Sequence, residues 1–248
     1  MNAASVANEF AKMRHHKVGV IAAVMVIAVV ALTVATATAS PGFYPDEPGA
    51  WNHLLARASL AVPLTSPLMV AVLASRHVDI EHQGGGWLLA AASGLTPGRM
   101  CRSKFVALGA VVAAATLAPS LLVLGFGGLL GISAPLPAGR WLGFVLCMTA
   151  VNLVLLAFHI VLAAKVENQL ISVGTGALGT LIAMFSPGLP PSFAHATPWG
   201  YYGLAHAAGY EGTRLVSLPI AYPSIAALSA VAGGLFFLIT HRFDRQEA

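Results

Sequence analysis

Six apolar blocks, each about twenty residues long, limit what this chain can fold into. A hydrocarbon core of about 30 Å is crossed by roughly 20 residues of helix, which matches the length of each block. Backbone groups in lipid have no water to bond, so each block is expected to form a helix. The predicted fold is an all-α polytopic membrane protein. Its predicted spans are residues 18–39, 56–75, 105–130, 141–164, 170–188 and 223–240.

The composition excludes an ordinary soluble domain. Of 248 residues, 57% are hydrophobic and only 9% are charged, whereas soluble domains have roughly a quarter charged residues. The net charge of +4 would suit nucleic acid, but the basic residues lie at the ends of the apolar blocks and form no single patch. The sequence therefore predicts membrane lipid, and not nucleic acid, as a partner.

The distribution of Lys and Arg predicts the orientation. Ten of the thirteen lie in the segments on the side of the two termini, and only Arg57, Arg140 and Arg214 lie on the other side. By the positive-inside rule both termini are cytoplasmic, and the expected location is the bacterial cytoplasmic membrane. Residues 35–40 resemble a signal-peptidase site, but the first block is longer than a typical signal core, which favours a span.

Two segments outside the spans contribute to the predicted architecture. Residues 5–17 place Val6, Phe10 and Met13 on one face of a helix among charged residues, which predicts a helix lying at the membrane interface. Residues 189–222 are rich in Pro, Trp and Tyr and are expected to cap the bundle on the outside. Nothing marks a second domain, so residues 1–248 are taken as a single transmembrane domain.

Glycines inside the spans predict close helix packing. Gly174, Gly176 and Gly179 formally match the dinucleotide-binding pattern G-x-G-x-x-G. That pattern requires a preceding strand and a later acidic residue, and an apolar block offers neither. Small residues in spans let helices approach closely, so these three glycines, together with Gly127 and Gly131, are predicted to lie at helix interfaces.

Several potential metal ligands lie just after the second predicted span. His77, Asp79, Glu81 and His82 are close in sequence, and His77 and Glu81 would share one face of a helix. A solvated turn beside the membrane explains the same residues, and we predict no metal site. Neither reading assigns the chain a cofactor.

Two polar residues of the fourth span are candidates for a role inside the membrane. Asn152 and His159 are seven residues apart and share one helix face. They either line a pathway or donate hydrogen bonds to a neighbouring helix, and the second reading is favoured. All nine acidic residues lie outside the predicted spans, which disfavours a proton-driven carrier.

The segment between the second and third spans, residues 76–104, is predicted to be folded. Three glycines at 84–86 should end a helix. A short helix is then expected over residues 87–93, with Gly94 as its terminator. Thr96 followed by a proline is typical of an N-cap and the first position of the next helix. Its apolar tip, predicted to include the first three residues of the short helix, would need a partner.

The residues of this segment resemble a known family. The order is Glu81, Gly84, Trp87, Leu88, Leu89, Arg99 and Lys104. It is similar to the first cytoplasmic loop of ABC-2 type permeases, and closest to the permeases of lantibiotic-immunity and bacitracin-type peptide exporters. The resemblance implies that residues 81–99 form a coupling helix that docks on an ATPase. It also implies a six-span subunit paired with a second copy or a paralogue.

The resemblance implies an exporter subunit that is not itself an enzyme. The sequence contains no Walker A motif, so ATP and Mg are expected on separate ATPase subunits, and this chain has no predicted catalytic residue or cofactor. A peptide antibiotic, a drug or a lipid would each suit as an amphipathic substrate. Two alternatives stay open: a membrane enzyme or assembly factor that uses His159, His195 and His206, and an ATP-independent channel or secondary carrier.

Overall fold

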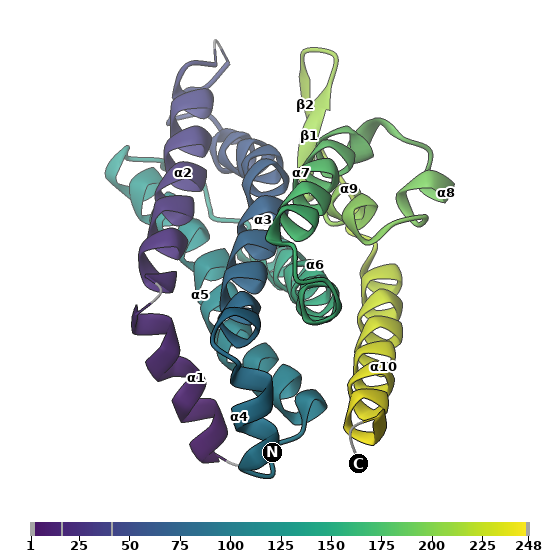
Figure 1. Ribbon diagram of the computed structural model, residues 1–248. Helices are drawn as coiled ribbons and strands as arrows, with labels where there is room; N and C mark the ends of the chain where they lie inside the picture. The colour runs from purple at the N-terminus through teal and green to yellow at the C-terminus, as the bar shows by residue number, and fades with distance from the viewer. Residues whose placement is uncertain (1–2, 16, 41, 247–248) are drawn as a thin grey trace.

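The computed structural model describes residues 3–15, 17–40 and 42–246, and over them the chain is a bundle of helices (Figure 1). Within these ranges, six helices are long and apolar enough to cross a membrane. They are α2 (Val18–Thr38), α3 (Ala50–Gln83), α5 (Pro97–Leu129), α6 (Ala138–Lys165), α7 (Gln169–Phe185) and α10 (Tyr222–Gln246). The prediction of an all-α polytopic membrane protein is confirmed.

The helices extend beyond several predicted spans. The second span was expected over residues 56–75, but α3 contains 34 residues and at 1.5 Å per residue is about 50 Å long. It therefore projects beyond a hydrocarbon layer of about 30 Å. The helices of the third and sixth spans are also longer than predicted: α5 begins at Pro97 and not at residue 105, and α10 ends at Gln246 and not at residue 240. Their additional helical turns are polar, because backbone hydrogen bonding continues beyond the apolar pattern.

The central helix is α3, and α10 is peripheral. In the most apolar window of α3, 72% of residues are buried inside the chain, against 11% for α10. Figure 1 shows α3 between α2 and α7, with α10 standing to one side. The apolar core gathers where α3, α5 and α6 pack together, and it includes Leu73, Leu108 and Leu155, which are fully buried.

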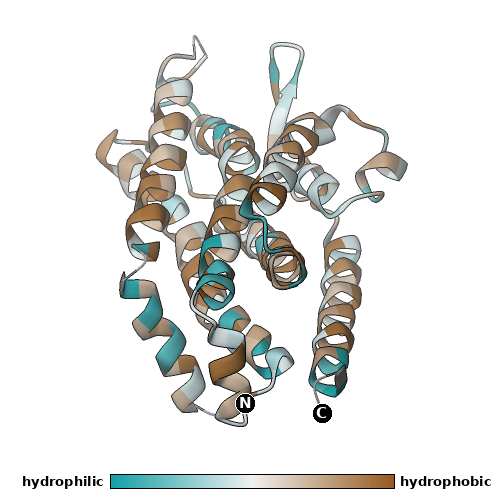
Figure 2. Ribbon diagram, viewed as in Figure 1, coloured by the Kyte–Doolittle hydropathy of each residue, from teal (hydrophilic) through white to brown (hydrophobic). Residues whose placement is uncertain are grey.

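The two ends of the bundle differ. One end holds α1 (Ala3–His15), α4 (Gly86–Ala92) and the C-terminal part of α10 (Figure 1), and we refer to it as the charged end. Figure 2 shows hydrophilic residues along α1 and at the last turns of α10, with hydrophobic residues along the helices between the ends. A helix, α1, is therefore present where the interfacial helix was predicted. It begins and ends two residues earlier than expected, and Lys17, with φ of 54°, separates it from α2.

The opposite end, which we call the hairpin end, holds the segment between α7 and α10. This segment contains η1 (Ser186–Gly188), α8 (Pro191–Ala194), η2 (Pro198–Gly200) and α9 (Tyr201–Leu204). It then forms an antiparallel hairpin of β1 (Ala208–Glu211) and β2 (Arg214–Ser217), with Ala208 opposite Ser217. Tyr202 is fully buried, so the segment inserts into the bundle as well as covering its end.

Three of the five predicted packing glycines lie at helix contacts. A Cβ at Gly127 would overlap the ring of Trp51, one at Gly176 would overlap Ala71, and one at Gly179 would overlap Trp199. Each glycine therefore allows a close approach that a larger residue would prevent.

The other two glycines make no such contact with the described residues of the chain. Gly174 and Gly131 have no heavy atom of another element within 4 Å of a built Cβ. Gly174 lies on the outer face of α7, whereas Gly131 has φ of 76° just after α5 ends. A positive φ is typical of glycine after a helix C-terminus, so Gly131 terminates α5.

Candidate functional site

The candidate site is built around α4, which lies at the charged end between α3 and α5. As predicted, the glycine run ends α3: Gly84 is its C-cap, and Gly85 has φ of 61°. The short helix spans Gly86–Ala92, one residue earlier than expected, and Gly94 has φ of 74°. Two positive φ values, which glycine adopts at no steric cost, allow the chain to reverse on both sides of α4.

The exposed tip of α4 consists of Leu88 and Leu89, which are 78% and 70% exposed. Trp87, predicted to belong to the same tip, is only partly exposed and packs back toward α3. Its indole Nε1–H donates to Nδ1 of His82 at 3.3 Å, and its ring lies 5.7 Å from the His82 ring, centroid to centroid. The structure therefore assigns the outward apolar surface to the two leucines and a supporting position to the tryptophan.

His82 links α4 to a third helix. If its Nδ1 accepts from the indole of Trp87, Nε2 carries the proton and donates to the carbonyl oxygen of Ala163 in α6 at 2.9 Å. Both ring nitrogens are used, so α4 is fixed against α3 and α6 at once. A pocket of about 320 Å³ lies beside this contact and includes Pro97, Lys165 and Phe243.

Glu81 and Lys104, predicted to serve ATPase coupling, lie beneath α4 and not on its surface. Glu81 is 3% exposed and Lys104 is fully buried. The Lys104 ammonium donates to Glu81 Oε1 at 2.7 Å, to Glu9 Oε2 at 2.9 Å and to the carbonyl oxygen of His77 at 3.0 Å. Any contribution of these two charges to coupling therefore acts through the position of the helices.

Helix α1 completes this buried ion network, which consists of Glu9, Lys12, His77, Glu81 and Lys104. Lys12 donates to Glu9 at 3.1 Å and to Glu81 at 2.7 Å, and Nε2 of His77 lies 2.8 Å from Glu9. Glu9 is 3% exposed. Two carboxylates and two ammonium groups thus join α1, α3 and α5 without net charge. Buried ionic groups add little net stability but are costly to separate, so the network fixes the relative positions of these helices.

The electrostatics of α1 follow from that arrangement. Burial alone would raise the pKa of Glu9, but the hydrogen bond from His77 and the charges of Lys104 and Lys12 outweigh it and lower the pKa to about 2. Burial would lower the pKa of Lys12, yet its bonds and charge interactions with Glu81 and Glu9 raise it above the usual value. Both groups are therefore charged at neutral pH, and α1 is held by ion pairs.

The four possible metal ligands after the second predicted span do not lie together. His77 faces Glu9, His82 faces Ala163, and the carboxylate of Asp79 accepts from the amide of Gln83. Among the residues that the structure describes, no group of three His, Cys, Asp or Glu side chains is placed to hold a metal ion. A single helix explains the separation, because successive residues point to different sides of α3.

The start of α5 is capped by a distant acidic residue, Asp244 of α10. Thr96 is the N-cap and Pro97 the first helical residue, as predicted, but the Thr96 hydroxyl donates to Asp244. Asp244 also accepts from the backbone N–H of Arg99 at 3.1 Å and from the guanidinium of Arg102 at 2.8 Å. The side chain of Arg99, a predicted coupling residue, is exposed. Asp244 therefore satisfies the helix N-terminus and ties α10 to α5.

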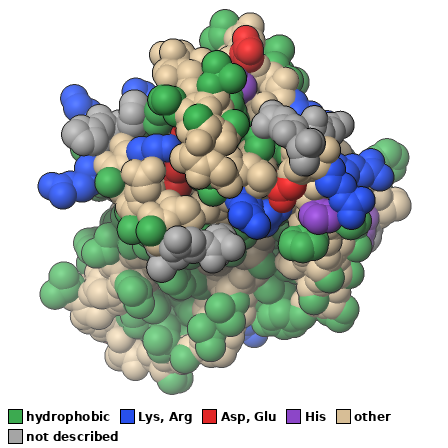
Figure 3. Space-filling model, turned by 60° about the horizontal axis from the view of Figure 1, so that its bottom comes forward, with side chains coloured by type: hydrophobic (Ala, Val, Ile, Leu, Met, Phe, Trp, Pro, Cys, Tyr) green, Lys and Arg blue, Asp and Glu red, His purple; other side chains and the backbone are tan. Residues whose placement is uncertain are grey.

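The surface of the charged end combines apolar and basic groups. Figure 3 turns this end toward the viewer and shows Lys and Arg side chains at several places around it, with hydrophobic side chains beside and below them. The exposed leucines of α4 belong to this end of the bundle, as does the exposed side chain of Arg99. Such a face suits a partner protein better than lipid tails.

The two polar residues of α6 are both fully buried. The Asn152 amide donates to the Thr116 hydroxyl at 2.8 Å and its oxygen accepts from the Tyr202 hydroxyl. Nδ1 of His159 lies 3.1 Å from the Ser172 hydroxyl. These contacts favour the reading that both residues bond to neighbouring helices.

Sequence reasoning did not find Glu9, Asp244 or Tyr202. The i, i+3 spacing of Glu9 and Lys12 was a signal that α1 carries an internal ion pair. Nothing local marked Asp244 or Tyr202, because their partners lie 145 and 50 residues away.

A comparison with protein families agrees with this architecture. The model of the family described as "ABC-2 family transporter protein" matches residues 5–185, a range that includes α4, the buried ion network and both polar residues of α6. A search of curated proteins gave no match. Because the matched range is well over half of the 248 residues, the chain belongs to the ABC-2 transporter family and is a multi-pass membrane permease.

Proposed function

We propose that the chain is the permease subunit of an exporter in which α4 is the docking element for a separate ATPase subunit. The observation that carries this proposal is the pair of exposed leucines on α4, since apolar side chains exposed at 78% and 70% outside the bilayer need a partner. Closure of the ATPase subunits would push α4, and α4 would pass the movement to α3 and α6 through His82.

The proposal includes the orientation, location and assembly of the subunit. The charged end faces the cytoplasm of a bacterium, with both chain termini inside, because ten of the thirteen Lys and Arg residues belong to that side. The permease pairs with a second copy or a paralogue, and ATP and Mg bind on the ATPase. The cargo is an amphipathic molecule such as a peptide antibiotic, a drug or a lipid, moved outward.

The buried ion network supports the proposal by making the docking element rigid. Force on a flexible loop would be absorbed locally, whereas α4 follows directly from the end of α3 that holds Glu81. Lys104 connects that end to α5, and Lys12 connects it to α1. Movement at α4 therefore reaches three helices together, as a coupled transporter requires.

Separation of the external histidines weighs against the alternative of a membrane enzyme. His159 contacts Ser172, His195 contacts Ser224, and His206 lies in a groove that Arg57 and Ser59 also line. These contacts belong to different parts of the fold. A carrier that works without ATP is distinguished by transport measured with and without the ATPase.

The decisive experiment measures ATPase binding by the double variant Leu88→Ala/Leu89→Ala in nanodiscs. Each substitution removes about three carbon groups, and if half of their area is buried on docking the pair contributes about 2 kcal/mol. Binding should weaken by roughly thirtyfold, with a parallel loss of ATP hydrolysis stimulated by the permease. The cognate ATPase would be sought among proteins that copurify with the wild-type chain.

A matched control is available in the lipid-facing part of α5. Leu121 and Leu122 are also adjacent and exposed, at 68% and 53%, but lie in the apolar middle of the chain's third span. Leu121→Ala/Leu122→Ala should bind the ATPase as the wild type does. Equal binding by both double variants would refute docking on α4. Trp87→Ala should give an intermediate loss because it releases His82 but retains both leucines.

A further inference from the structure

A groove at the hairpin end contains unusual polar atoms. It lies between α2, α3 and α7, and its volume is about 250 Å³. Leu60, Leu64 and Met184 are its exposed apolar residues, at 49%, 37% and 44% exposure, so the groove opens on the side that faces lipid. Arg57 and His206 also line it.

Arg57 has no carboxylate partner within ion-pair distance among the residues that the structure describes. One nitrogen of its guanidinium donates to the Ser40 hydroxyl at 3.2 Å, and its central carbon lies 4.7 Å from the centroid of the Tyr210 ring. Its Nε is buried and has no hydrogen-bond acceptor in the described part of the chain. A guanidinium with one neutral hydrogen-bond acceptor and one aromatic contact, beside an apolar groove, retains most of its capacity to bind an anion.

Two further polar atoms at this groove are buried without a partner in the described ranges: Oγ of Ser59 and Nε2 of His206. Ser59 is fully buried and His206 is 4% exposed. Leaving such atoms unbonded costs free energy, so three of them at one groove indicate a polar group that the protein binds there.

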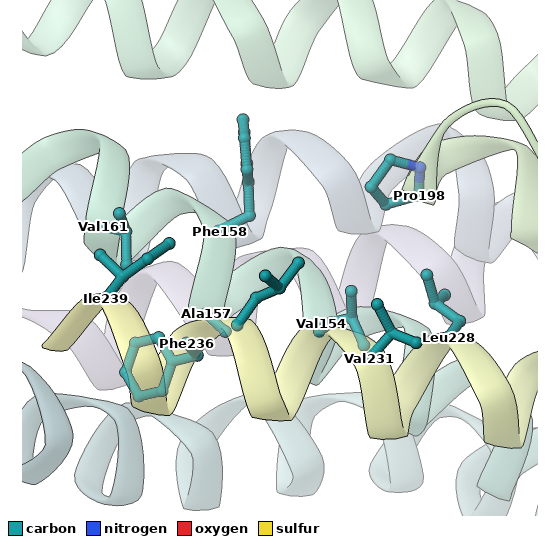
Figure 4. A pocket seen from close by; sticks show the side chains of 11 residues that line it. Val154, Ala157, Phe158, Val161, Pro198, Leu228, Val231, Phe236 and Ile239 are labelled. Atoms are coloured by element: carbon teal, nitrogen blue, oxygen red, sulfur yellow. The ribbon is translucent and has the colours of Figure 1, made fainter. Parts of the chain in front are cut away.

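The groove between α6 and α10 provides a contrast (Figure 4). It also measures about 250 Å³, and Figure 4 shows Phe158 and Val161 of α6 across from Phe236 and Ile239 of α10. The side chains that line it are all apolar. An acyl chain fits such a surface, but nothing there selects a charged head. Arg57 thus distinguishes the groove of α2, α3 and α7 from the groove of Figure 4.

We propose that the groove between α2, α3 and α7 binds an anionic amphiphile, with its carboxylate or phosphate on Arg57 and its apolar chain along Leu60, Leu64 and Met184. The hydroxyl of Ser59 and Nε2 of His206 bond the neutral polar atoms beside the anionic group. Few polar groups placed in an otherwise apolar pocket are typical of a ligand site, where they fix orientation. The identity of this amphiphile as cargo rests on the proposed function, whereas its binding does not.

The charge at the site is set by Arg57 alone. Burial lowers the pKa of His206 to about 4, so the imidazole is neutral at pH 7. No Asp or Glu is among the residues that line the groove. The groove therefore presents a single positive charge to the lipid boundary, which favours an anionic head over a zwitterionic or cationic one.

The test measures binding of dansyl-labelled undecanoic acid and of its methyl ester to the purified chain in phosphatidylcholine nanodiscs, with empty nanodiscs as background. No ATPase is present, so the result is independent of docking on α4. We expect saturable binding of the acid and at least tenfold weaker binding of the ester, since a hydrogen bond between charged groups contributes about one to two decades.

Variants locate the site. Arg57→Gln should abolish the preference for acid over ester, and Arg57→Lys should restore part of it. Leu64→Trp should fill the groove and weaken both probes, while Ala232→Trp in the groove of Figure 4 should change neither. Thermal unfolding identifies any variant that misfolds. If Arg57→Gln misfolds, the comparison of Leu64→Trp with Ala232→Trp decides whether the probes bind in this groove. Retention of the acid preference by folded Arg57→Gln, or equal losses for the two tryptophan variants, would overturn the proposal.

Inorganic phosphate separates an amphiphile site from a site for a free anion. Phosphate at the concentration of the probe should displace none of the bound acid, because it lacks the apolar chain that contacts Leu60 and Leu64. Displacement at that concentration would show that the head alone accounts for binding, and the assignment of an amphiphile would be wrong.

Discussion

Replacement of Lys104 by methionine should destabilise the fold strongly, because it removes a fully buried ammonium group. The group donates to Glu81 at 2.7 Å, to Glu9 at 2.9 Å and to the carbonyl oxygen of His77 at 3.0 Å. Removing one partner of a buried ion pair typically costs 3–5 kcal/mol, since the remaining charge is uncompensated. Lys12 still contacts both carboxylates here, so we expect the lower limit, about 3 kcal/mol.

The assay is thermal unfolding of the purified chain in a mild detergent. For a chain of this size about 3 kcal/mol corresponds to a fall in Tm of roughly 6–12 °C. Lys165→Met is the matched control: Lys165 is exposed, and its ammonium lies 5.5 Å from the Phe243 ring, a contact contributing about 0.5–1 kcal/mol. Its Tm should fall by no more than about 4 °C.

A second variant tests the reason for the effect. In Lys104→Met/Glu81→Gln the opposing charge is removed as well, and the loss of stability should be smaller than the sum of the two single losses. A Tm of Lys104→Met equal to that of Lys165→Met, or additive losses in the double variant, would contradict a costly buried charge at this position. Either result would mean that water reaches these charges in the purified chain, so that their separation costs little.

Three further predictions concern packing, pH and topology. Gly176→Leu should lower the Tm because its side chain would overlap Ala71, whereas Gly174→Leu, with open space at its Cβ, should leave it unchanged; equal shifts would contradict the packing explanation. The folded pKa of Glu9 is about 2 against an ordinary 4.5, so it contributes about 3 kcal/mol that is present above pH 4.5 and lost as pH falls through 2. The difference in stability between wild type and Glu9→Gln should therefore be constant above about pH 5 and decline below it. A reporter fused after Ala248 should be cytoplasmic and one inserted at Ala194 external; the reverse labelling would contradict the proposed orientation.

The sequence was most informative where local rules apply. The six spans followed from apolar block length, and the turn around α4 followed from glycine at 84–86 and at 94, two of which have positive φ. The helix ends were less predictable, because α3 continues past its apolar block to Gln83. Polar residues that extend a helix can be stabilised by partners from elsewhere in the chain, and no local pattern shows those partners.

The positions of the candidate site residues were also predicted correctly only in part. Leu88 and Leu89 were placed correctly on an exposed short helix, whereas Trp87 was assigned to the tip although it packs on His82. Glu81 and Lys104 were predicted as ATPase-coupling residues, and nothing in the local sequence showed that both are buried, since charged residues are mostly exposed. Their burial depends on Glu9 and Lys12, which approach only when α1 folds back on the bundle.

The capping of α5 by Asp244 has a consequence for the biogenesis of the protein. The acceptor for the N–H of Arg99 lies 145 residues later in the chain. At about 5–20 residues per second, translation adds that stretch in roughly 7–30 s. During this interval α5 is inserted with its first turn uncapped, and α5 and α6 are packed together without their later partner α10. Synthesis and insertion of α10 therefore complete the capping of the α5 N-terminus. Truncation before Asp244 would leave a bundle that is inserted but lacks the bonds between α10 and α5, and membrane quality control can recognise such a bundle.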